Sequence, residues 1–126
     1  MSLDKHTVDN IAREAEAATD LPADFADACR QPGHPYHRLA KALLGAYVQA
    51  AHGKGKDRHA NDLPFERQRM QTIAQGQGSA EGLIYQVCKK AQESQRMARG
   101  DKIHELGGVI VYAAGAIVFE ENRHES

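Results

Sequence analysis

One stretch near the end of the chain decides the fold: residues 106–119 read LGGVIVYAAGAIVF. It carries no charged side chain over fourteen positions, and it follows Asp101, a residue type that favours a helix start. Fourteen uncharged residues are fewer than the roughly 20 that a membrane-spanning helix needs. The stretch therefore predicts an apolar helix at the centre of a helical bundle and no membrane span.

The glycines inside this helix indicate close packing. Each one costs about 1 kcal/mol relative to alanine, a cost that is tolerated where another backbone comes close. Gly108 and Gly115 lie seven residues apart and so share nearly one face. Two interpretations stay open: packing against the third or fifth predicted helix, or a self-association seam formed by Gly108, Val111, Tyr112 and Gly115.

Apolar residues at helical spacing predict five more helices before the last one. They cover about residues 4–18, 22–29, 35–51, 62–75 and 79–99. Proline stands in the first turn of three of them. The stretch Gly76-Gln77-Gly78 ends the fourth, Ser79 is placed to cap the fifth, and Gly100 to end it. In the fifth helix we expect a buried face of Ile84, Val87, Cys88 and Ala91 and a solvated face of Lys89, Lys90 and Glu93.

Length and composition point to one ordinary domain. The chain has 126 residues, of which 41% are hydrophobic and 26% charged, and its formal net charge is −1. That balance provides no global attraction to nucleic acid or to an anionic membrane. Cys29 and Cys88 are too few for a disulfide framework and are expected to be small buried hydrophobes in a reduced cytoplasm. Met1 to Leu3 could belong to an expression leader.

The most specific polar feature is a basic strip on the third predicted helix and the loop after it. Side chains at steps of three or four residues project from one side of the helix: His34, Arg38, Lys41, Gly45, Gln49 and His52. The loop adds Lys54, Lys56, Arg58 and His59. Together they suit an anion such as a phosphate group, with Arg38, Lys41, Lys54, Lys56, Arg58 and His59 as the candidate ligands. The alternative is an ordinary solvated helix face.

Other chemistry finds less support in the sequence. His34 and His37 have the spacing to share a metal ion, but no paired motif completes a site, so no metal or cofactor is predicted. Glu105 stands in the first turn of the last helix, where the helix dipole favours a carboxylate. The paired carboxylates of all-helical nucleotide pyrophosphatases are missing, because no second carboxylate follows Glu105 at the required spacing.

Three segments carry a resemblance to a known group. They are residues 53–66, Gln86 with residues 89–93, and residues 105–107 with 112–114. Over roughly residues 35–121 the chain resembles small uncharacterised helical proteins of bacteriophages and prophages. The resemblance implies a bacterial cytoplasmic setting and a phage-derived gene, and it carries no catalytic residue across.

The sequence thus predicts an all-α, bundle-like single domain of five or six helices with the glycine- and alanine-rich last helix at its centre. The function it favours is that of a small, non-enzymatic, self-associating interaction protein, a homodimer. The alternative is an anion- or nucleotide-binding protein, with nucleotide hydrolysis as one form of it, that uses the basic strip and its loop.

Overall fold

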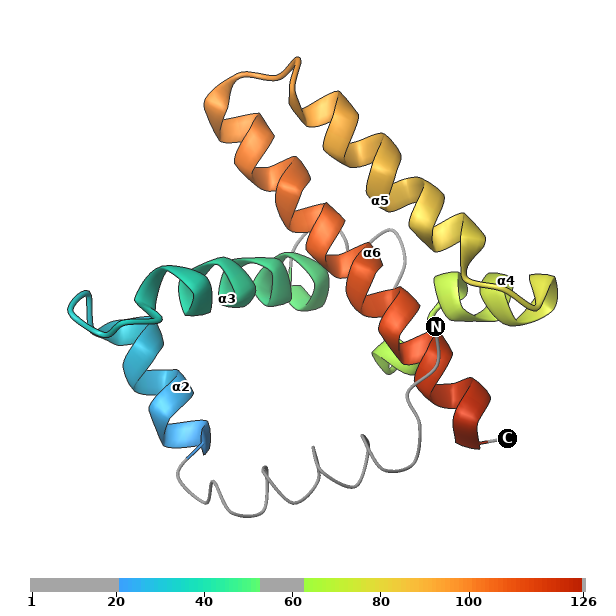
Figure 1. Cartoon of the computed structure of the whole chain (residues 1–126), viewed down its shortest axis with the longest axis horizontal. Helices are drawn as coiled ribbons and strands as arrows, with labels where there is room; N and C mark the ends of the chain where they lie inside the picture. Colours follow the sequence, from blue (N-terminus) through green and yellow to red (C-terminus); the bar gives the residue numbers. More distant parts are fainter. Residues whose placement is uncertain (1–20, 53–62, 126) are drawn as a thin grey trace. The chain divides into compact units, whose positions relative to one another are not determined.

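The structure, a computed structural model, describes residues 21–52 and 63–125. In that part of the chain every regular element is a helix, so the all-α prediction is confirmed (Figure 1). The elements are α2 (Leu21–Arg30), α3 (His37–His52), the 3₁₀ helix η2 (Phe65–Arg67), α4 (Arg69–Gln77), α5 (Glu81–Ser94) and α6 (Arg99–Glu125). The helix expected at residues 4–18 lies outside the described residues.

The chain divides into two compact units, residues 1–44 and 45–126. The boundary falls inside α3, which runs across it as one continuous helix. The first unit holds α2 and the start of α3. The second holds the end of α3 together with η2, α4, α5 and α6.

In the second unit, α5 and α6 run side by side in opposite directions as a helical hairpin (Figure 1). Residues 95–98 connect them. Near the other end of the hairpin α4 packs against both helices, and a small apolar core forms there. Its buried members are Ala74, Leu83, Ala116 and Phe119, with Met70, Ala80 and Tyr112 packed around them. The last helix is therefore the element on which η2, α4 and α5 all pack.

Several predicted boundaries are right and others need correction. The end of α4 is confirmed, because Gly78 takes the left-handed conformation at φ 72° and caps the helix. The start of α4 is wrong: extended backbone at Gln68 separates the short η2 helix from α4, which begins at Arg69. The end of α5 and the start of α6 are also wrong: α5 ends at Ser94, and α6 begins at Arg99 with Gly100 and Asp101 in its first turn.

The face that α5 was expected to bury is rotated. Leu83 and Ser94 are its buried residues, whereas Ile84 and Cys88 are exposed. Apolar residues at positions 83, 84, 87, 88 and 91 straddle two adjacent faces, so their spacing alone does not choose between them. The expected burial of Cys88 is wrong for the same reason, and Cys29 is half-buried.

Candidate functional site

One face of α6 holds the second unit together. Glu105, Gly108, Tyr112, Gly115 and Phe119 follow one another at steps of three and four residues, and so lie on a single side of the helix. A Cβ added at Gly115 would lie 2.7 Å from Met70 Sδ, and one at Gly108 would lie 3.5 Å from the Lys90 side chain. These glycines therefore admit side chains of α4 and α5, and we call this side the packed face of α6.

A partly buried ion pair joins α5 to this packed face. Lys90 Nζ donates to Glu105 Oε1 at 2.6 Å, and the two side chains are 27% and 16% exposed. The same ammonium lies 5.7 Å from the centroid of the Tyr112 ring, within the range of a cation–π contact. Lys90 was expected on the solvated face of its helix. That expectation is wrong because its partner stands on another helix, 15 residues away in the chain.

Gln71 of α4 is a buried polar residue that the sequence pattern did not single out. Its side chain is fully buried, and its Nε2 donates to the backbone oxygen of Gly115 at 2.7 Å. Its Oε1 is buried without a hydrogen-bond partner among the described residues. The bond attaches α4 to α6 at the point where Gly115 leaves room for it. In the sequence, only the paired glycines of α6 predicted that a neighbouring element would pack closely against this part of the helix.

The opposite face of α6 has the same spacing and is exposed at three of its five positions, while Ile110 and Ala113 between them are half-buried. Ile103, Leu106, Ile110, Ala113 and Ile117 again follow at steps of three and four residues, two positions before the packed set. Ile103 and Ile117 are 62% and 61% exposed, and Leu106 is 39% exposed. We call these five residues the open stripe. The expectation that α6 is covered all round is therefore wrong for this side.

By length and composition α6 could also cross a membrane. Residues Arg99–Arg123 make a helix long and apolar enough to do so, more than the fourteen uncharged residues suggested. This is weak evidence, because core helices of water-soluble proteins pass the same test. The neighbouring α5 weighs against it, since Lys89, Lys90 and Glu93 lie on a helix that runs along α6.

A shallow, half-open pocket of about 270 Å³ lies where α4, α5 and α6 meet. Its lining is mainly apolar, with polar side chains at some positions: Arg69, Met70, Ile73, Ala74, Gln77, Gly82, Leu83, Gln86 and Tyr112. Among these residues only Arg69 and Tyr112 are ionisable. The lining therefore offers no acid–base pair, and it suits an apolar group better than a charged substrate.

The described part of the basic strip is exposed at Arg38, Lys41, Gly45 and His52, whereas Gln49 is half-buried on α3 and His34 is half-buried in the turn before it. Arg38 and Lys41 are exposed on α3, whereas Lys54, Lys56, Arg58 and His59 lie outside the described residues. The strip therefore remains a prediction.

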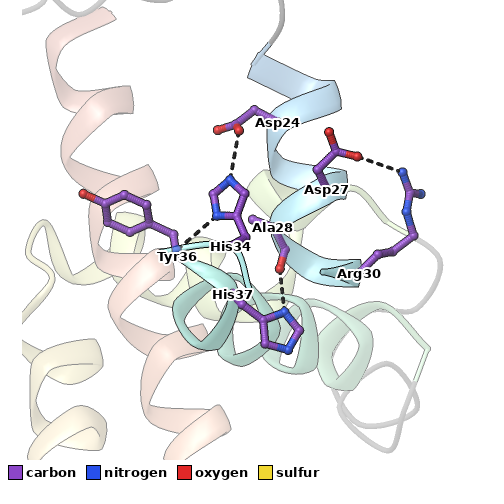
Figure 2. A network of polar contacts seen from close by, with 7 residues as sticks. All are labelled: Asp24, Asp27, Ala28, Arg30, His34, Tyr36 and His37. Atoms are coloured by element: carbon purple, nitrogen blue, oxygen red, sulfur yellow. Dashed lines mark hydrogen bonds and ion pairs between the residues drawn. The ribbon is translucent and has the colours of Figure 1, made fainter. Parts of the chain in front are cut away.

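The two histidines at the start of the strip hold the first unit together (Figure 2). His34 Nδ1 accepts the backbone N–H of Tyr36 at 3.1 Å, which leaves Nε2 as the protonated nitrogen that meets Asp24 Oδ1 at 3.0 Å. His37 Nδ1 lies 2.7 Å from the backbone oxygen of Ala28 and must donate to it. His37 thus fastens α3 to α2, and His34 fastens the turn before α3 to α2. Within residues 21–52 and 63–125 no group of three or more His, Cys, Asp or Glu side chains could hold a metal.

Comparison with protein-family models, with curated proteins and with solved structures finds no match to this chain. Of the four residues predicted as a seam, Gly108, Tyr112 and Gly115 lie on the packed face, and Val111 is half-buried beside them. Among the described residues, the large apolar side chains that α6 exposes lie on the open stripe, at Ile103, Leu106 and Ile117.

Proposed function

We propose that this chain is a small, non-enzymatic helical interaction protein that acts by self-association. The observation that supports this most is how few large apolar side chains are buried. Among the described residues only Leu83 and Phe119 are large hydrophobic side chains in the core, against fourteen that are exposed. Scattered exposed apolar residues are normal in a monomer, but this ratio favours a surface that another chain covers.

Self-association is favoured over a charged partner by the charge of the chain. The formal net charge of −1 gives two copies little mutual repulsion and gives no strong attraction to a polyanion. The exposed hydrophobic residues also recur along whole helices, as on α3 and α6, and do not gather in one deep cleft. Flat helical surfaces of this kind suit another helix better than a small molecule.

Sedimentation equilibrium across the micromolar range tests the proposal. We expect the mass of a dimer at the upper end of the range and a reversible shift toward monomer on dilution. A folded chain that stays monomeric throughout, with native helical circular dichroism, would overturn it.

The alternative function, binding of an anion or nucleotide with hydrolysis as one form, is a second proposal. Arg38 and Lys41 support it, since they are exposed and lie about one turn apart on α3. A thermal-shift series with pyrophosphate and nucleoside triphosphates tests it, because a ligand at about 100 times its Kd stabilises a protein by about 2.7 kcal/mol. If the melting temperature rises and Arg38→Ala with Lys41→Ala removes the rise, the strip binds anions; no rise would overturn this alternative.

The cytoplasmic location and the phage-derived origin that the sequence resemblance implies belong to the same proposal. The polar α5 beside α6 supports a water-exposed setting. Fractionation of bacterial cells that express the chain tests the location, and recovery in the membrane fraction would contradict it.

A further inference from the structure

We infer that two copies of this chain associate through the open stripe of α6, with the two α6 helices antiparallel. The inference rests on the proposed function, which requires only that the chain self-associates, and it specifies the surface and the orientation. A second copy of this chain is the partner that the geometry of the stripe favours.

The spacing of the stripe is that of a helix–helix seam. Ile103, Leu106, Ile110, Ala113 and Ile117 alternate steps of three and four residues over two heptads, the pattern with which one helix packs along another. The stripe extends about 21 Å along the helix at 1.5 Å per residue. Its side chains are large at both ends and small at Ala113, and Ala114 lies beside it, so two such helices can approach closely near the middle.

The packed face cannot serve as this seam. Phe119 is 3% exposed, and the surface at Gly115 is occupied by Met70 and Gln71. A second copy could reach that face only by displacing α4 and its hydrogen bond from Gln71. The open stripe lies on the opposite side of the same helix, away from α4, and its exposed residues are Ile103, Leu106 and Ile117.

Charges at the ends of the stripe select the antiparallel orientation. The N-terminal end has a net positive charge, from Arg99 and Lys102 against Asp101. The C-terminal end has a net negative charge, from Glu120 and Glu121 against Arg123, which pairs with Glu120. In a parallel pair each basic end would meet its own copy, and so would each acidic end. In an antiparallel pair the basic end of one copy meets the acidic end of the other, which is favourable on both sides of the two-fold axis.

A lipid bilayer is the competing occupant of an apolar stripe. It is disfavoured because α5 runs along α6 and brings Lys89, Lys90 and Glu93 to the same depth. Lys89 and Glu93 are about half exposed, and their side chains lie 4.0 Å apart on the outer side of that helix. Burial of such groups in hydrocarbon is costly, whereas a second α6 would leave them in water.

Disulfide trapping tests both surface and orientation. In a background with Cys29→Ala and Cys88→Ser, single variants Ile103→Cys, Ile110→Cys and Ile117→Cys are oxidised in the full chain. Because a disulfide needs Cα atoms within about 7 Å, an antiparallel pair centred near Ile110 links Ile110→Cys to itself. It leaves Ile103→Cys unlinked to itself, since those two residues lie about 21 Å apart along the seam. A mixture of the Ile103→Cys and Ile117→Cys chains should form the mixed disulfide.

The outcomes separate this inference from the proposed function. Self-linking at all three positions would show a parallel pair and overturn the orientation. A dimer by sedimentation that links at none of them would overturn the seam and leave self-association standing. A monomer in buffer that sediments with phosphatidylcholine vesicles would overturn both.

A charge-insertion pair gives an independent readout. Ile103→Glu combined with Ile117→Glu should weaken the dimer at least about 100-fold in Kd, because each change occurs twice in a symmetric seam. Tyr85→Glu is the matched control: Tyr85 is exposed to the same 62% as Ile103 but stands on α5. An equal loss of association in the control, or none in the double variant, would overturn the inference.

Discussion

The two faces of α6 have almost the same spacing of residues and opposite surroundings. On the packed face Gly108, Tyr112, Gly115 and Phe119 meet α4 and α5, and on the open face Ile103, Leu106 and Ile117 meet solvent. The open face carries the larger aliphatic side chains, and the packed face carries two glycines. The difference shows that residue size on this helix does not by itself mark the core.

What distinguishes the faces is how closely a neighbour approaches. At Gly115 a side chain of α4 comes so near that no Cβ fits without movement, and a buried glutamine bonds to the helix backbone there. Such contact needs small residues. The larger side chains on the open stripe instead suit an ordinary helix–helix seam, with about 8–10 Å between axes.

The largest effect on stability is expected when the aromatic side chain of Phe119 is removed from the packed face. Phe119→Ala should lower the free energy of unfolding by about 3 kcal/mol or more, because Phe119 is 3% exposed in a core of few large side chains. Urea denaturation followed by circular dichroism measures it. A loss below about 1 kcal/mol would mean that this face contributes little to the stability of the chain.

A smaller but still large effect is expected from filling the space at Gly115. Gly115→Val should destabilise the fold by about 2–3 kcal/mol, since its Cβ would lie 2.7 Å from Met70 Sδ and its methyl groups would approach Gln71 and Leu83. Gly45→Val is the matched control, because nothing lies within 4 Å of a Cβ there and both sites are helical. Equal changes in the two variants would contradict close packing at Gly115.

The elements of this fold follow from local signals that the sequence displays. Gly78 ends α4 as predicted, and the Ser79 hydroxyl accepts the N–H of Glu81 at 2.9 Å at the start of α5. The apolar stretch of α6 predicted a helix on which others pack. Each of these depends on residues within a few positions of one another, and such signals can be read directly from a sequence.

The arrangement of faces could not be predicted in the same way. Lys90 forms an ion pair with Glu105, 15 residues away in the chain, and Gln71 forms a hydrogen bond with Gly115, 44 residues away. These partners are chosen by the packing of whole helices, and helical periodicity contains no information about them. The glycines correctly indicated a close neighbour but not its identity, and four of the six candidate anion ligands lie outside the described residues.

A moderate effect is expected at the ion pair on the packed face. Glu105→Gln should cost about 1–2 kcal/mol, because it leaves the Lys90 ammonium partly buried without its charge partner. Glu93→Gln removes the partner of Lys89, a pair that is about half exposed with its atoms 4.0 Å apart, and should cost less than about 0.5 kcal/mol. Thermal unfolding of the two variants compares them. Equal losses would show that the inner pair is no stronger than the surface pair.

The smallest effect on the folded monomer is expected on the open stripe. Ile117→Ser should change the free energy of unfolding by no more than about 0.5 kcal/mol at low protein concentration, because the side chain is 61% exposed and lies outside the apolar core. If a second copy covers Ile117, the free energy of unfolding of the variant should fall further below that of the wild-type chain as the protein concentration rises. The reason is that association stabilises the wild-type chain more than the variant. Urea titrations over a concentration series measure this dependence. A deficit that is large at every concentration would place Ile117 in the core of the monomer and remove the contrast between the two faces of α6.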